Sequence, residues 1–143
     1  MLGYVCKYTP MELFEAMDTE ITRLEPSVTD FNHADTLMHA NICSYTKAVL
    51  EDVMEHDYEG VILTTCCDSI RRLYDTLKSQ FPDKFFFLLD IPRKFNDFAV
   101  ALYERQLKQM LTEYEAFSGK TLDLKRFVSM MPVSYTHLTL PTN

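Results

Sequence analysis

The stretch VILTT at residues 61–65 decides the fold, because its β-branched character is typical of a strand buried in a parallel sheet. Gly60 precedes the stretch and interrupts the chain. Residues 68–80 follow with apolar side chains at helical spacing, and the apolar run Phe85–Leu89 comes next. This strand–helix–strand order predicts two parallel strands joined by a right-handed crossover.

The same alternation extends in both directions along the chain. Short strands are expected at 3–6 and 21–24, helices over 11–17 and 44–56, and a loop with a short helical turn over 25–41. The last and longest helix runs from Asp97 to Phe117 and stops before Gly119. We therefore expect an α/β fold: a parallel, Rossmann-like sheet with helices on both faces.

Several residues have expected local roles in these helices. Thr9, Pro10 and Glu12 are typical of a helix start, with a Thr N-cap, Pro at the first helical position and a capping box. Asp68 is expected to cap the helix that follows it. Helical spacing predicts core positions in the two longer helices, namely Tyr45, Ala48, Val49, Asp52, Val53, Phe98, Leu102, Met110, Tyr114 and Phe117.

Residues 1–127 form one expected α/β domain, and residues 128–143 differ from them in composition. All 35 charged residues lie in the first 127, whereas the last sixteen contain no Asp, Glu, Lys or Arg. We interpret residues 128–143 as a non-native or disordered tail, in which residues 134–142 have no helical face. A floppy natural tail is the alternative.

Composition and charge exclude several classes of function. The 143 residues carry 14 Lys and Arg against 21 Asp and Glu, a net charge of −7. An acidic chain is poorly suited to nucleic acid or to an anionic membrane surface. The chain opens with no signal peptide, and no apolar run approaches the roughly 20 residues needed to cross a bilayer. We expect a cytoplasmic protein without nucleic-acid or membrane partners.

Four cysteines occupy comparable places in the expected topology. Cys6 and the pair Cys66 and Cys67 end strands, and Cys43 directly precedes a helix. Without a secretion signal, reduced thiols are expected rather than disulfides. Carboxyl ends of parallel strands share one edge of the sheet, where thiolates could hold a soft metal or an iron–sulfur cluster. Buried or incidental thiols remain the alternative; Cys67, nearer its helix, is a better candidate than Cys66.

Three segments carry a resemblance to a known family: YVCKYTPMEL at 4–13, NICSYTK at 41–47 and TCCDSIRRLYD at 65–75. With IPR at 91–93 and the long helix ending at Gly119, they resemble the D-component family of 2-hydroxyacyl-CoA dehydratases. That family also includes benzoyl-CoA reductase subunits and double-cubane cluster proteins. The resemblance covers about residues 2–127, which would be the first of two Rossmann-like domains.

The resemblance implies a cofactor and partners. Family members hold a [4Fe-4S] cluster through three cysteines, of which Cys43 and Cys67 would be two and the third would lie in a second domain; a double-cubane cluster is the variant. Cys6 lies in a shared motif and is a further candidate. The partners would be an acyl-CoA substrate, a second dehydratase subunit and an ATP-dependent iron–sulfur activator protein that supplies one electron.

The implied reaction is that of a lyase. A 2-hydroxyacyl-CoA would lose water through a ketyl radical, and this chain, as a fragment, would be inactive alone. Two alternatives stay open: an aryl-CoA or small-molecule reductase subunit on the same scaffold, and a non-catalytic α/β module that binds a partner. Arg71, Arg72, Arg93 and Lys94 could meet CoA phosphates, although solvated surface positions explain them as simply.

Overall fold

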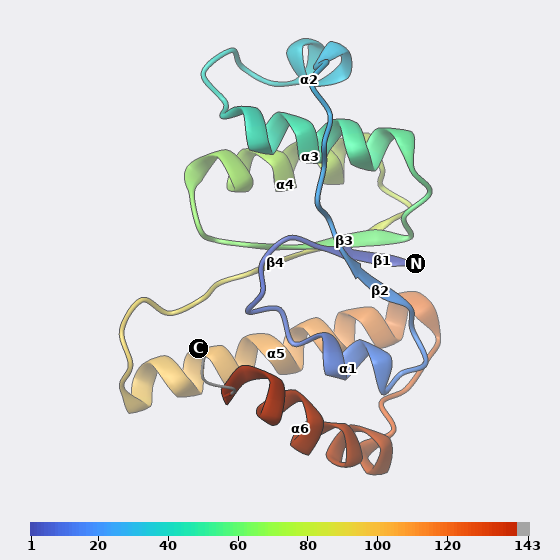
Figure 1. The fold of residues 1–143 in the computed structure, drawn as a ribbon, viewed down its shortest axis with the longest axis vertical. Coiled ribbons are helices and arrows are strands. Elements are labelled where there is room, and N and C mark those ends of the chain that lie inside the picture. Colours follow the sequence, from blue (N-terminus) through green and yellow to red (C-terminus); the bar gives the residue numbers. More distant parts are fainter. Residues whose placement is uncertain (140–143) are drawn as a thin grey trace.

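The structure, a computed structural model, describes residues 1–139 and the side chains of residues 1–131. Four parallel strands form one sheet in the order β2-β1-β3-β4 (Figure 1). Their bounds are β1 (Leu2–Tyr4), β2 (Ile21–Arg23), β3 (Gly60–Thr64) and β4 (Phe85–Leu89). The all-parallel α/β fold predicted from the sequence is confirmed.

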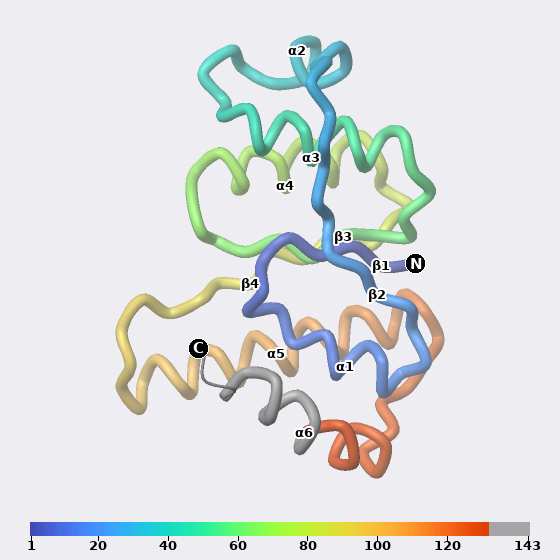
Figure 2. The backbone as a smooth tube through the Cα atoms, in the orientation of Figure 1, coloured from blue at the N-terminus to red at the C-terminus, as the bar shows by residue number. Residues whose placement is uncertain are grey.

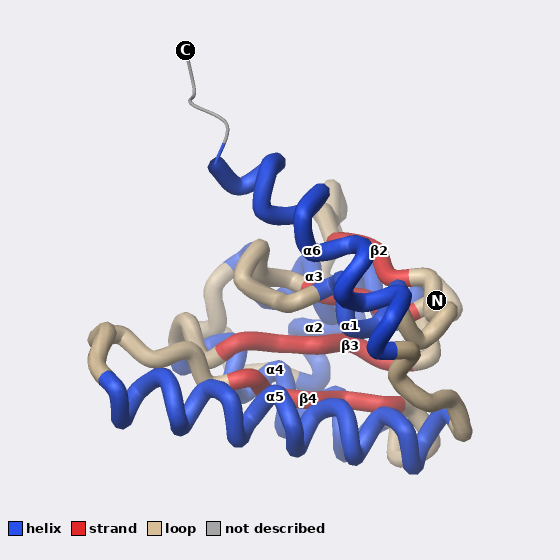
Figure 3. Tube along the Cα trace, turned by 90° about the horizontal axis from the view of Figure 1, so that it is seen from below, coloured by secondary structure: helices blue, strands red, loops and turns tan. Residues whose placement is uncertain are grey.

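Helices cover both faces of this sheet, as expected. On one face lie α3 (Ser44–Glu55) and α4 (Asp68–Gln80), with the short α2 (Asn32–Leu37) outside them (Figure 1). On the other lie α1 (Met11–Glu15) and α5 (Asp97–Ser118), with α6 (Leu124–Thr139) beyond α1 (Figures 1 and 3). Figure 2 shows the chain passing from β2 across the sheet to α2. No helix among residues 1–139 is long and apolar enough to span a bilayer.

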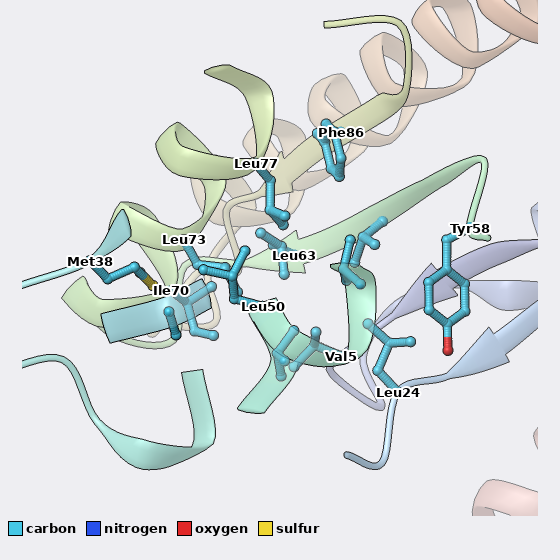
Figure 4. Close-up of a cluster of buried hydrophobic side chains, with 14 residues drawn as sticks. Val5, Leu24, Met38, Leu50, Tyr58, Leu63, Ile70, Leu73, Leu77 and Phe86 are labelled. Carbon is cyan, nitrogen blue, oxygen red and sulfur yellow. The ribbon is translucent and has the colours of Figure 1, made fainter. Parts of the chain in front are cut away.

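Strand β3 contributes to two hydrophobic cores because its side chains alternate between the faces. Val61 and Leu63 lie in the core beneath α3 and α4, together with Leu50, Leu73 and Leu77 (Figure 4). Ile62 belongs to the core of the other face, with side chains of α1 and α5. Burial on both faces explains why this strand is a continuous apolar run.

The start of β3 needs glycine for close contact with its neighbour. Gly60 pairs with Phe85 of β4, and a Cβ atom on Gly60 would lie 2.0 Å from the Phe85 carbonyl oxygen. The backbones of Gly60 and Phe85 are paired in the β3–β4 ladder, so neither strand can move away without breaking hydrogen bonds of this ladder. The glycine that marks the strand in the sequence therefore also sets the spacing of β3 and β4.

Two predicted helix caps are wrong. Pro10, not Thr9, is the N-cap of α1, and no side chain caps this five-residue helix. Thr9 instead closes a turn, its N–H donating to the Cys6 carbonyl, and its buried hydroxyl has no partner among the described residues. Similarly, Cys67 is the N-cap of α4, so Asp68 occupies the first helical position without a capping bond.

Three predicted core residues, Phe98, Tyr45 and Phe117, are also exposed. Phe98 lies near the start of α5, which has 22 residues and is about 33 Å long, whereas β4 has five residues and spans about 17 Å. The helix therefore extends beyond the sheet at its first turns (Figure 3), where Phe98 is exposed although Ala99 next to it is buried. Tyr45 is exposed for a related reason, since it lies in the first turn of α3. Met110 and Tyr114 are fully buried, as predicted.

The helical part of the chain ends later than the sequence predicted. Helix α6 continues from Leu124 to Thr139, which includes residues 134–139 of the stretch expected to have no helical face. Phe127 packs against the core beneath α1 and α5, whereas Leu124 and Val128 are exposed. Residues 140–143, also assigned to the tail, lie outside the described residues.

Candidate metal centre

Helices α1, α3, α4 and α5 begin at the edge of the sheet where the strands end (Figure 1). Cys43 is the N-cap of α3 and Cys67 is the N-cap of α4. These two helices pack beside each other on one face of the sheet. The two thiols thus occupy equivalent places on neighbouring helices, and Cys6 lies in the loop after β1 at the same edge.

The sulfur of Cys43 is held by hydroxyl groups from two helices. Its Sγ lies 3.1 Å from the Oγ1 of Thr46, a fully buried residue one turn into α3. Partial burial acts to raise the pKa of Cys43, but hydrogen bonds from Thr46, from Ser69 and from the amides of the first turn of α3 lower it below its ordinary value. Ser69 belongs to the first turn of α4, directly after Cys67 and Asp68. The start of α4 therefore reaches the Cys43 sulfur.

Cys66 lies in a different environment from Cys43. Burial raises the pKa of Cys66, and the nearby thiols of Cys67 and Cys6 raise it further. Cys66 is thus a neighbour of Cys6 across the ends of β3 and β1. After burial, Cys6 also raises the pKa of Tyr103 on α5 and of Tyr45 on α3, so Cys6 lies near helices of both faces.

These contacts link the thiols along the edge. Cys43 and Cys67 start the helices of one face, and Cys66 interacts with both Cys67 and Cys6. Among the side chains of residues 1–131, no three His, Cys, Asp or Glu come together closely enough to hold a metal ion. The described residues therefore offer pairs of thiol donors without a third ligand.

Helix geometry favours anionic sulfur at Cys43 and Cys67. The first amides of a helix have no partner within it, and their partial positive charge stabilises an anion. Two parallel helices that start at adjacent points present this environment twice. Such a position lowers the free energy of a thiolate, and thiolates are the usual ligands of iron–sulfur clusters.

An open hollow lies on the other side of the same edge. It has a volume of about 460 Å³ and is lined by residues of the loop after β1, the loop after β4 and the start of α5. The Tyr103 hydroxyl donates to the carbonyl of Tyr8 at 3.1 Å and joins α5 to the loop after β1. Arg93 and Lys94 line this hollow, whereas Arg71 and Arg72 lie on α4.

The hydroxyl groups around Cys43 were not predicted from the sequence. Thr46 and Ser69 were not singled out, although Thr46 follows Cys43 by three residues, the spacing at which an N-cap side chain faces the first turn. That spacing was a usable signal for Thr46. Ser69 could not be found in this way, because its contact depends on how α3 and α4 pack.

Together these features define a class: a parallel α/β domain with cysteines at the starts of neighbouring helices. The chain matches the HGD-D family, the 2-hydroxyglutaryl-CoA dehydratase D-component, over residues 6–134. It therefore belongs to this family, and the resemblance seen in the sequence is confirmed. No curated protein matches the chain.

Proposed function

We propose that the chain is part of an iron–sulfur subunit of a 2-hydroxyacyl-CoA dehydratase, in which Cys43 and Cys67 ligate a [4Fe-4S] cluster. Membership of a dehydratase-component family supports this function. The observation that carries the assignment of the residues is the contact of the Cys43 sulfur with Ser69, because it brings the α4 start, capped by Cys67, to the α3 start.

The residues present suit part of such a cluster site. Two thiols at helix starts match the donors that iron–sulfur clusters use. A third thiolate would have to come from outside the described residues, from further chain or from a partner protein. When bound, the cluster would supply a low-potential electron and a Lewis-acidic iron to the thioester of a 2-hydroxyacyl-CoA.

The chain's own residues would prepare and shield this site. Thr46 would hold the Cys43 sulfur by a hydrogen bond, which stabilises its thiolate form. The first amides of α3 and α4 would offset negative charge on the sulfurs. An ATP-dependent activator protein and a second dehydratase subunit complete the proposal as electron donor and partner.

Metal binding by the reduced chain tests the ligand assignment. Anaerobic titration with Cd²⁺, followed by the sulfur-to-metal charge-transfer absorption, should show a site that Cys43→Ser and Cys67→Ser each weaken about tenfold or more. Cys66→Ser is the matched control, since it removes the adjacent thiol, and it should leave the affinity nearly unchanged. A stronger loss with Cys66→Ser than with Cys67→Ser would contradict the assignment.

Activity tests the reaction. The subunit assembled with its partner and reduced activator should convert a 2-hydroxyacyl-CoA to the enoyl-CoA, measured by chromatography of the thioesters. Reduction of an aryl-CoA in its place, without dehydration, would favour the reductase on the same scaffold.

A further inference from the structure

The first turns of α5 and the loop before them expose a group of apolar side chains. Phe95 is 96% exposed and Phe98 is 78% exposed, and Tyr8 and Val100 beside them are also exposed. We call these four residues the α5 overhang patch. Phe95, Phe98 and Val100 lie at or directly before the start of α5, where the helix extends beyond the sheet (Figure 3). Tyr8, Phe95 and Val100 line the 460 Å³ hollow. Clustered exposed aromatics of this kind usually mark an interaction surface.

Cations outnumber carboxylates around this patch in an otherwise acidic chain, although Asp97 beside Phe98 is exposed. Lys7, Arg93 and Lys94 are exposed, and none of them forms an ion pair with any residue in the described part of the chain. Other cations, such as Arg72 and Lys108, have carboxylate partners. The free cations beside the patch therefore favour an occupant that carries negative charge.

The shape of the patch favours a protein segment over a small molecule. Pockets for small ligands enclose most of the ligand's surface. Here the two phenylalanines protrude, and the hollow between the 91–95 loop and α5 is an open trough with Tyr103 along one side. The Tyr103–Tyr8 hydrogen bond joins α5 to the loop after β1, which also lines the trough. A helix that places an apolar stripe in such a trough is a common mode of recognition.

We infer that the α5 overhang patch binds an acidic amphipathic helix of another protein, whose apolar stripe contacts Phe95 and Phe98 and whose carboxylates face Lys7, Arg93 and Lys94. This inference does not depend on the cluster, because none of these residues is a proposed ligand. A protein bound here would lie beside Cys6 and cover that part of the edge from solvent.

Two labelled synthetic helices of equal length test the inference by fluorescence anisotropy with the purified chain. One contains leucine and glutamate in an amphipathic pattern, and the other has lysine in place of each glutamate. The acidic helix should bind at least about tenfold more tightly than the basic one, and its affinity should fall as salt is added. Equal affinities, or no measurable binding of the acidic helix, would overturn the inference.

Substitutions locate the binding surface. Phe95→Ser and Phe98→Ser should each weaken binding of the acidic helix about tenfold, as expected for exposed aromatic anchors. Arg93→Glu should have a similar effect. Leu124→Ser and Lys125→Glu are matched controls on α6, because both residues are exposed and lie outside the patch. Equal losses in the controls would overturn the location.

Two other occupants give different results in the same experiments. Displacement of the acidic helix by coenzyme A at micromolar concentration would identify the patch as a nucleotide-thioester site and overturn the inference. Concentration-dependent dimerisation in sedimentation velocity, abolished by Phe98→Ser, would identify a second copy as the occupant and also overturn it. Both measurements use the parent chain and variants whose far-UV circular dichroism matches that of the parent chain.

Discussion

Replacing Glu51 by alanine should destabilise the protein strongly, although Glu51 is a charged residue in the middle of a helix. Its side chain is only 3% exposed and lies between α3 and α2. One carboxylate oxygen accepts from the Ala34 amide at 2.8 Å, and the other lies 2.7 Å from Nδ1 of His33. The Glu51 carboxylate thus satisfies an amide in the first turn of α2, a helix without any side-chain N-cap.

The magnitude follows from these two contacts. A hydrogen bond to a charged group contributes about 1.5–3 kcal/mol, and an orphaned buried N–H costs about 1–3 kcal/mol. Glu51→Ala loses both contacts and should lower the free energy of unfolding by about 3 kcal/mol. Glu51→Gln keeps an oxygen for Ala34 but loses the charge, so about 1–2 kcal/mol is expected. Most of this lost stability should come from weaker packing of α2 against α3, because both contacts of Glu51 join these two helices.

Urea unfolding followed by circular dichroism measures these changes. With a slope of about 2 kcal/mol per molar, Glu51→Ala should lower the midpoint by about 1.5 M. Glu55→Gln is the matched control, since Glu55 is an exposed glutamate at the end of the same helix, and it should leave the midpoint nearly unchanged. A Glu51→Ala midpoint equal to that of the parent chain would refute the argument.

The same residue should make stability depend on pH. Burial acts to raise the pKa of Glu51, but the Ala34 amide and His33 lower it below the ordinary value of 4.5. The folded protein therefore holds the proton less tightly than the unfolded chain. This contribution is fully present above the unfolded-state pKa and is lost as the pH falls through the lower folded-state pKa. Glu51→Gln should flatten that part of the stability curve, whereas Glu55→Gln should not.

Three further predictions concern the pairing of β3 with β4, the reactivity of two thiols, and the hydrophobic core beneath α1 and α5. Gly60→Ala should lower the free energy of unfolding by about 3 kcal/mol or more, because its Cβ would meet the Phe85 carbonyl; an unchanged urea midpoint would contradict this. At pH 7 iodoacetamide should alkylate Cys43 faster than Cys66, because the pKa is lowered in Cys43 and raised in Cys66; peptide mapping by mass spectrometry measures both rates, and the reverse order would disprove the contacts around Cys43. Tyr114→Phe removes a hydroxyl bonded to Thr19 and Glu59 and should cost about 1–2 kcal/mol in thermal unfolding, so an unchanged melting temperature would count against these bonds.

Most of the fold could be predicted from patterns with a clear physical cause. Strand β4 and helix α4 have the predicted bounds, because a buried apolar run and a strongly amphipathic segment each have one favourable structure. The end of α5 at Gly119 was also predictable, since Gly119 has a positive φ of 70°. These features depend on residues close together in the sequence.

The errors concern residues whose role depends on distant neighbours. Thr9 has the right spacing for a helix cap, but the chain after β1 turns back on Cys6 and buries it. Glu51 was not singled out, because its value comes from α2 packing over α3. Phe98 has core spacing, but the sheet beneath it ends too early.

The site could be predicted only in part. The common edge of the cysteines follows from the parallel topology, and the structure places Cys43 and Cys67 at the starts of two neighbouring helices. The different surroundings of Cys66, and the Ser69 contact to Cys43, depend on side-chain packing and were not predictable. Ligation of iron by Cys43 and Cys67 stays a prediction.

The strand order has a consequence for the space between β1 and β3. The chain leaves β1 toward α1 on one face and leaves β3 toward α4 on the other, so the winding direction reverses between these two central strands. At such a topological switch point the connections diverge and a crevice opens outside the strand ends. Cys6 follows β1 and Cys66 follows β3, so both thiols lie at this switch point. Their position there is a property of the winding and does not depend on the helices that the two cysteines precede.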